Sequence, residues 1–254
     1  MKQFKTLMSF AISLLLPFAA LSAEPKEPEM YSYATYFMCE PDKEDAADEL
    51  IKTAYAPVYD AAVKDGTITG WGWLAHQTGG EWRRILYHAA PSVTGLLSAQ
   101  EKMGEKLDKA LGKGADAIAT GCTSHVDYIW QFVAGSKPAT DNSPRGKASM
   151  SVYMECDFTT EDRADEIVKT VFAPVYNEFV GKGQLTSWGW LAHVVGGKYR
   201  KLATMSAENY DDLLKARAAI LNKLFMEGDK KIGEEFSSIC GSHEDYLWTI
   251  KQET

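Results

Sequence analysis

The hexapeptide WGWLAH occurs twice in this chain of 254 residues, at Trp71–His76 and again at Trp188–His193. Six identical residues, two of them tryptophan, do not recur by chance at this length. The similarity extends outward from the hexapeptide. At an offset of 117 (188 minus 71), about half of the positions from Tyr36 to Gly80 match those from Tyr153 to Gly197. The chain is therefore a tandem duplication.

A second block of matches follows one inserted residue, which changes the offset to 118 (240 minus 122). It pairs Cys122, Ser124, His125, Asp127, Tyr128 and Trp130 with Cys240, Ser242, His243, Asp245, Tyr246 and Trp248. We therefore expect two repeats, at residues 31–134 and 148–254. The stretch between them, 135–147, holds glycine, serine and proline and is typical of a linker.

The N-terminus has the features of a secretory signal peptide. Lys2 and Lys5 precede an apolar run from Leu7 to Leu21, and a small-residue cleavage site ends at Ala23. At about 15 residues, the apolar run is shorter than the roughly 20 that a membrane-spanning helix needs. We predict that residues 1–23 are removed and that the mature protein is soluble and exported, either periplasmic or secreted.

The charge balance of the chain argues against several classes of partner. The formal net charge is −8, from 27 Lys and Arg against 35 Asp and Glu, and removal of the two leader lysines makes it −10. Nucleic acids and anionic membrane surfaces attract basic patches, and no cluster of lysine and arginine stands out. We expect neither nucleic acid nor membrane as a partner.

Each repeat shows the element order β-α-β-β-α-β, the split pattern of ferredoxin-like folds. Aromatic and β-branched runs predict the strands, Gly79-Gly80 predicts a hairpin, and helical periodicity predicts the helices. Pro57 lies inside the first helix and predicts a kink or a break there. In the first repeat the predicted strands are 33–39, 68–77, 82–89 and 126–133, and the helices are 44–64 and 93–111. The second helix of the other repeat is predicted over 208–226, with Asn209 as its cap.

Four cysteines in an exported chain favour disulfides. In the predicted sheet the first and fourth strands are neighbours, so the end of the first lies beside the start of the fourth. We therefore predict one bond in each repeat, Cys39–Cys122 and Cys156–Cys240. The alternatives are free thiols or a metal site, but metal sites usually have closely spaced cysteine pairs, which this chain lacks.

Two such units in one chain resemble the dimeric α/β-barrel superfamily, in which two β-α-β-β-α-β units pack sheet to sheet. The resemblance covers residues 31–250 in topology and repeat. It implies an α+β fold in which two ferredoxin-like repeats form an intramolecular pseudo-dimeric barrel. The superfamily includes cofactor-free monooxygenases, stress-responsive barrel proteins and haem-containing chlorite-dismutase-like proteins, and a fold by itself does not choose among these functions.

The tryptophans of the hexapeptide are the first candidates for a binding site. Side chains alternate between the two faces of a strand, so Trp71 and Trp73 share one face, as do Trp188 and Trp190. One interpretation is packing in the core or between repeats, because a buried tryptophan removes about 200 Å² from water. The other is that these rings line a pocket for an apolar or aromatic ligand.

The histidines are candidate catalytic groups, and four are matched between the repeats: His76, His193, His125 and His243. His125 and Asp127 lie two residues apart on a predicted strand, so both point to the same face, and His243 and Asp245 repeat the pattern. A carboxylate so placed can orient an imidazole as a general base. The alternative is that each histidine satisfies a backbone group near the disulfide.

A further matched set is suited to binding a carboxylate or a phenolate: Tyr36, Tyr153, Arg83 and Arg200. Arginines that follow a hairpin are also common on protein surfaces, so the alternative is that Arg83 and Arg200 are ordinary surface residues. The chain contains no P-loop, Rossmann glycine signature, HExxH or GxSxG. We assign no metal, and the sequence leaves the cofactor unknown.

Together these features lead us to expect an exported tandem barrel that binds a small organic ligand among the matched aromatics and histidines. One alternative is an enzyme of the same superfamily, either monooxygenase-like with His125–Asp127 or His76 as the base, or haem-binding. Another is a purely structural or protein-interaction module. We expect a monomer, because the internal pseudo-twofold takes the place of a dimer.

Overall fold

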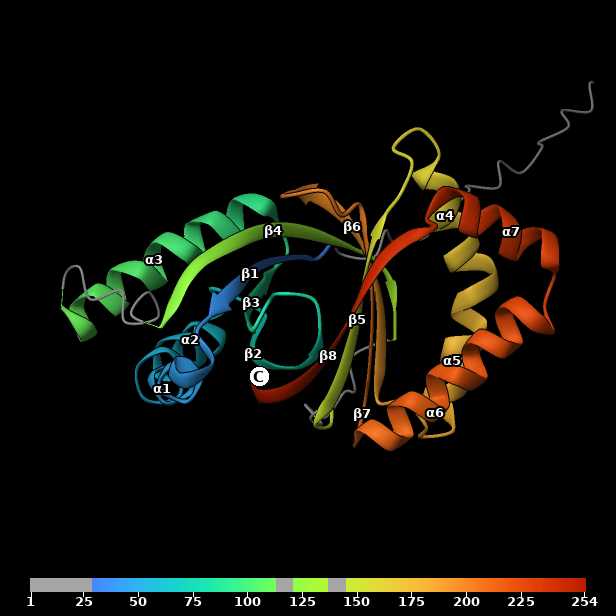
Figure 1. The fold of residues 1–254 in the computed structure, drawn as a ribbon. Helices are drawn as coiled ribbons and strands as arrows, with labels where there is room; N and C mark the ends of the chain where they lie inside the picture. The colour runs from blue at the N-terminus through green and yellow to red at the C-terminus, as the bar shows by residue number, and fades with distance from the viewer. Residues whose placement is uncertain (1–28, 113–120, 137–144) are drawn as a thin grey trace, which may run out of the picture.

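A computed structural model describes residues 29–112, 121–136 and 145–254, and in it eight antiparallel strands close into a barrel (Figure 1). Around the barrel the strand order is β1-β3-β2-β8-β5-β7-β6-β4. The strands are β1 Tyr31–Cys39, β2 Gly70–Gly79, β3 Arg84–Ala90, β4 Cys122–Gly135, β5 Ala148–Glu155, β6 Ser187–Val195, β7 Lys201–Ala207 and β8 Ser242–Glu253. The predicted signal peptide, 1–23, lies outside the described residues.

The two repeats meet edge to edge. Within each repeat the first strand lies between the third and the fourth. The second strand of each repeat then pairs with the fourth strand of the other, β2 with β8 and β6 with β4. The expected barrel is present, but its two sheets join edge to edge and do not pack sheet to sheet. An open sheet leaves two edges of unpaired backbone groups, and closing the barrel pairs them.

Helices cover the outer face of the barrel, with α1–α3 on one side and α4–α7 on the other (Figure 1). They are α1 Glu44–Leu50, α2 Ala56–Lys64, α3 Val93–Leu111, α4 Glu161–Ile167, α5 Ala173–Gly181, α6 Tyr210–Leu221 and α7 Lys230–Ile239. The α+β class is as predicted, and α3 has the predicted bounds. Asn209 caps α6, since its side chain accepts a hydrogen bond from the backbone N–H of Asp212 at 3.0 Å. The helical prediction for 208–226 did not include α7.

The helix predicted over 44–64 is continuous, and near Pro57 it contains a wider, π-helical turn instead of a break. A π-helical turn, Ile51–Tyr55, joins α1 to α2, and Pro57 lies in the first turn of α2. Proline lacks an N–H and its ring crowds the preceding turn, and a wider turn relieves both problems. The second repeat has the same arrangement, with a π-helical turn at Val168–Phe172 before Pro174.

Alternate residues of the strands contribute to separate cores. Residues that face outward pack under the helices and form one core in each repeat. Residues that face inward, together with two from the hairpin turns, fill the barrel with aromatic rings. The strands contribute Tyr36, Tyr128, Trp130, Tyr153, Tyr246 and Trp248, and the turns contribute Trp82 and Tyr199. The space available for a ligand must therefore be sought between the barrel and its helices.

Both predicted disulfides are confirmed. Cys39–Cys122 has an S–S distance of 2.03 Å, and Cys156–Cys240 has one of 2.05 Å. The bonded residues are 83 and 84 positions apart. Loops of this length correspond to a stabilisation of about 4–5 kcal/mol per bond in the chain-entropy model. Within the described ranges, no helix is both long enough and apolar enough to span a membrane.

Candidate functional site

The tryptophans of both WGWLAH segments point outward, into the layer under the helices. Trp73 is 1 % exposed, and its indole N–H donates to the carboxylate of Asp48 at 2.7 Å. Trp190 is 2 % exposed and donates to Asp165 at the same distance. Each indole is therefore fixed in orientation by a carboxylate on the first helix of its repeat.

A buried cation holds each of these carboxylates. Nε of Arg84 donates to Asp48 at 2.8 Å, and Nζ of Lys201 lies 2.8 Å from Asp165. Burial raises the pKa of Asp48, but hydrogen bonds from Arg84 and Trp73 and the charge of Arg84 lower it on balance. The ionised carboxylate thus accepts hydrogen bonds from both the indole and the guanidinium.

The structure brings two of the matched histidines, His76 and His193, together with the matched arginines at the two seams of the barrel. Nδ1 of His76 lies 2.7 Å from Nη1 of Arg83, whose Nε donates to Glu44 at 2.6 Å. The second repeat contains the same chain of contacts through His193, Arg200 and Glu161. A guanidinium can only donate, so the imidazole nitrogen accepts. Burial lowers the pKa of both imidazoles, which favours the neutral ring.

Tyr36 and Tyr153 lie apart from these groups, in the middle of the barrel. Each is 1 % exposed, and their ring centroids are 5.5 Å apart in an edge-to-face arrangement. The Tyr36 hydroxyl also accepts a hydrogen bond from the indole of Trp130 at 3.1 Å. These two tyrosines pack against each other and do not surround an open space.

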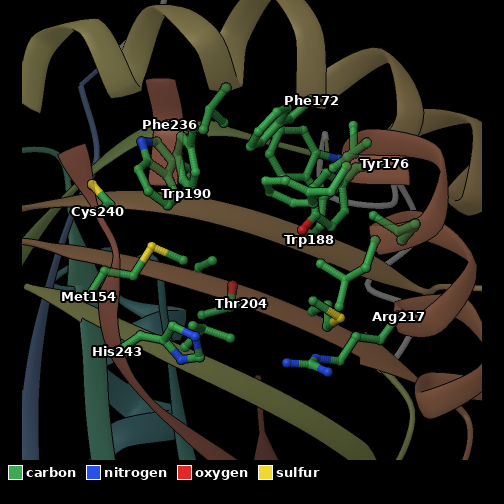
Figure 2. Close-up of a pocket in the computed structure, with 18 of the residues that line it drawn as sticks. Met154, Phe172, Tyr176, Trp188, Trp190, Thr204, Arg217, Phe236, Cys240 and His243 are labelled. Carbon is green, nitrogen blue, oxygen red and sulfur yellow. The ribbon is translucent and has the colours of Figure 1, made fainter. Parts of the chain in front are cut away.

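A cavity of about 260 Å³ lies in the second repeat, between the barrel and its helices (Figure 2). Trp188 and Trp190 form part of its wall, together with Phe172 and Tyr176 from the helical layer. Most of the other lining side chains are aliphatic or aromatic: Val152, Met154, Val168, Ala203, Met205, Ile220, Leu221, Leu224, Phe225 and Phe236. The cavity is therefore suited to an apolar molecule.

Polar side chains occupy the side of the cavity opposite these rings, where Figure 2 shows Arg217 and His243. Nδ1 of His243 lies 2.9 Å from Oδ1 of Asp245, and Oδ2 of Asp245 accepts a hydrogen bond from Arg217 at 2.6 Å. Tyr176 stacks on Trp188 with a centroid distance of 5.0 Å. Burial raises the pKa of Tyr176 to about 12 against the opposing charge of Arg217, so its phenol stays protonated.

Two larger side chains stand at the corresponding positions of the first repeat. Leu86 stands at the position of Ala203, and Phe37 stands at the position of Met154. Phe37 is 9 % exposed, and its ring packs 5.9 Å from that of Trp73. Differences between the repeats, and not the residues they share, therefore determine where the cavity lies.

The histidine–aspartate pair of the first repeat has other surroundings. Nε2 of His125 lies 3.6 Å from the Asp127 carboxylate, and the imidazole side chain is 55 % exposed. Burial and the neighbouring Asp127 raise the pKa of Tyr33 to about 12. The second repeat has Met150 in place of Tyr33. The two pairs are thus alike in sequence but differ in what they contact.

Two polar residues of the cavity, Tyr176 and Arg217, are not among the site residues predicted from the matched pattern. Arg217 comes eight positions after the helix cap Asn209, and the residue eight positions after the cap Ser92 of α3 is Gln100. The signal that could have identified Arg217 is this difference between the repeats.

Several solved structures have the same fold as this chain. A putative monooxygenase from Lactobacillus acidophilus is 9 % identical, with a TM-score of 0.58, and the alignment covers 90 % of this chain and 96 % of that one. A putative monooxygenase from Fusobacterium nucleatum is 8 % identical, with a TM-score of 0.59 and coverage of 89 % and 93 %. An anthrone oxidase-like protein is 10 % identical, with a TM-score of 0.56 and coverage of 90 % and 94 %.

The chain therefore has the fold of these proteins, in keeping with its resemblance to dimeric α/β barrels. Here the two units of the barrel are successive repeats of one chain, as the sequence predicted. No protein-family model and no curated protein sequence matches the chain. Because identities of 8–10 % show the fold alone, the function must be argued from the cavity.

Proposed function

We propose that this protein binds a small, planar and largely apolar organic molecule in the cavity of its second repeat. The observation that carries the proposal is the space of about 260 Å³ beside Trp188 and Trp190. Protein interiors are close-packed and leave few voids larger than a water molecule. Flat rings on the wall favour a flat ligand, since aromatic groups stack or meet edge to face.

The volume of the cavity limits the ligand. It exceeds the roughly 150 Å³ of a cavity that binds benzene and lies just below the roughly 300–1,000 Å³ of pockets for drug-sized molecules. A molecule of about two fused rings is therefore the right size, and a haem is too large for this space. Across the described residues, no group of three or more His, Cys, Asp or Glu is placed to hold a metal ion.

Export and a monomeric state are parts of the same proposal. Two disulfides support an oxidising compartment, in keeping with the signal peptide predicted over residues 1–23. Both seams of the barrel lie within one chain, which supports a monomer. Tryptic mapping of protein secreted by its own export route would identify the first residue of the mature chain.

Filling the cavity is expected to weaken ligand binding. Ala203→Leu introduces the side chain that the first repeat has at this position, Leu86. Isothermal titration with 2-naphthamide should give a Kd of about 10 μM to 1 mM for the wild type, a range reasonable for a two-ring ligand. The variant should bind at least tenfold more weakly, because the added methyl groups occupy the ligand's volume.

The matched control is Ala219→Leu, which adds the same side chain on the exposed surface of α6. It should bind 2-naphthamide as the wild type does. Circular dichroism establishes that both variants are folded. Binding by Ala203→Leu with wild-type affinity would place the ligand elsewhere and refute the proposed site.

Catalysis in the same cavity is the second candidate, and the contact between His243 and Asp245 favours it. A carboxylate at Nδ1 leaves the basic atom of the neutral imidazole at Nε2, where it can take a proton from a bound ligand. The names of the structural neighbours suggest oxidation by O₂ as the reaction class.

An oxygen electrode with 1,4-dihydroxynaphthalene, a molecule of two fused rings, tests this candidate, since O₂ converts it to 1,4-naphthoquinone and hydrogen peroxide. Wild-type protein should accelerate O₂ uptake, and His243→Ala should reduce that acceleration by about 10²-fold or more, the contribution typical of a general base. His125→Ala removes the matching histidine of the other repeat, which does not line the cavity; it is the control and should retain full activity. Equal uptake with and without protein would leave binding as the function.

A further inference from the structure

The charged groups that face the cavity are of one sign. Three of its lining side chains can ionise: Tyr176, Arg217 and His243. Tyr176 is protonated because burial raises its pKa to about 12, and Arg217 always carries its charge. Among the described residues that line the cavity there is no aspartate, glutamate or lysine. The wall is therefore positive, although the whole chain has a formal net charge of −8.

The carboxylate that balances Arg217 lies behind the wall. Asp245 contacts Nη2 of Arg217 at 2.6 Å and Nδ1 of His243 at 2.9 Å, but it does not line the cavity. It thus orients both groups from the far side. The guanidinium has five N–H donors in a fixed plane, so one contact with Asp245 leaves donors for a second partner.

The arginine is present in the repeat that has the cavity and absent at the matching position of the other repeat. The counterpart of Arg217 in the first repeat is Gln100, at the same distance from its helix cap. The first repeat keeps the histidine and the aspartate as His125 and Asp127. If the arginine served only to hold Asp245 in place, we would expect an arginine beside the matched Asp127 as well. Because only the repeat with the cavity has one, the arginine is better explained as a contact for a ligand in the cavity.

We infer that the ligand of this cavity carries an anionic oxygen group, which Arg217 binds while the apolar body lies against Trp188 and Trp190. The inference rests on the proposed function and adds a chemical class to it. A charge-assisted hydrogen bond to an anion is stronger than one between neutral groups. Planar acids such as aryl carboxylates have the required combination.

Two ligands of equal shape test the inference by isothermal titration: 2-naphthoate, which is anionic, and 2-naphthamide, which is neutral. Wild-type protein should bind the naphthoate at least about tenfold more tightly, as expected for a hydrogen bond to a charged group. Arg217→Gln, which introduces the residue of the first repeat, should remove this preference and leave the affinity for 2-naphthamide within about threefold. Arg217→Lys should keep part of the preference.

Lys215→Gln is the matched control, because it removes one positive charge from the same helix at an exposed position paired with Asp211. It should keep the full preference for 2-naphthoate. Equal affinities of the wild type for both ligands, or an unchanged preference in Arg217→Gln, would overturn the inference and leave the binding site in place. Absence of binding by either ligand would overturn the proposed function and the inference together.

Discussion

Replacement of Trp248 by alanine is expected to lower the free energy of unfolding by about 3–5 kcal/mol, the range for deleting a large buried aromatic side chain. Trp248 is 0 % exposed and stacks on Tyr246 with a centroid distance of 5.1 Å. It also meets the ring of His76 at 5.9 Å, across the seam between β2 and β8. The substitution therefore removes packing inside the barrel and weakens its closure. Urea denaturation followed by circular dichroism measures the change.

The surface supplies the control for this experiment. Phe158 is 73 % exposed, so Phe158→Ala should change the free energy of unfolding by less than about 1 kcal/mol. Trp130 is the counterpart of Trp248 and stacks on Tyr128 at 4.9 Å, so Trp130→Ala should be destabilising to a similar degree. A change below about 1 kcal/mol for Trp248→Ala would show that the aromatic interior contributes little to stability.

The second large effect is a pH dependence that originates at His88. This histidine is 1 % exposed and stacks on Tyr33 with a centroid distance of 5.5 Å. Burial lowers its pKa to about 4, although a hydrogen bond with the carbonyl oxygen of Leu96 acts in the opposite direction. The unfolded chain takes up the proton near pH 6.5. Stability from the neutral ring is therefore present above pH 6.5 and is lost progressively as the pH falls toward 4.

Linkage between the two pKa values gives a loss of about 3 kcal/mol for this group between pH 7 and pH 4. His88→Met introduces the residue of the second repeat, Met205, which is 4 % exposed there. The variant should lose about 3 kcal/mol less stability than the wild type over this pH range. Carboxylates that titrate in the same range contribute equally to both proteins, so the difference isolates His88.

Urea denaturation at a series of pH values provides the comparison. His125→Met is the control, because His125 is exposed, and its curve should follow that of the wild type. Parallel curves for His88→Met and the wild type would mean that the buried ring stays charged or becomes exposed in the native state.

The repeat made much of the fold predictable. Since Cys39 and Cys122 end and begin neighbouring strands, the topology by itself gave the disulfide pairing that the structure confirms. The bounds of α3 and the cap at Asn209 followed from helical periodicity and capping chemistry. The strand pairing that closes the barrel was not predictable in this way, because each edge strand pairs with a strand of the other repeat.

The candidate site was harder to predict, because the search rested on what the repeats share. Trp188 and Trp190 lie at the cavity, whereas Tyr36 and Tyr153 pack inside the barrel. Residues are identical in the two repeats where both repeats have the same requirement, and the most general requirement is packing of the core. The cavity arises from smaller side chains such as Ala203 in place of Leu86, and pattern matching discards such differences. A search for matched positions at which the second repeat has a smaller side chain or an additional charge would have identified Arg217.

The seam between β2 and β8 also has a consequence for the synthesis of the chain. Gly72 pairs with Glu253, about 180 residues later (253 minus 72). While the first repeat emerges, its β2 and β4 edges have no neighbour, and unpaired edges are templates for aggregation. Pairings over such separations also form slowly. We therefore expect the half-made protein to depend on a chaperone until β8 arrives, and a ribosome-stalled first half to bind one in pull-down experiments.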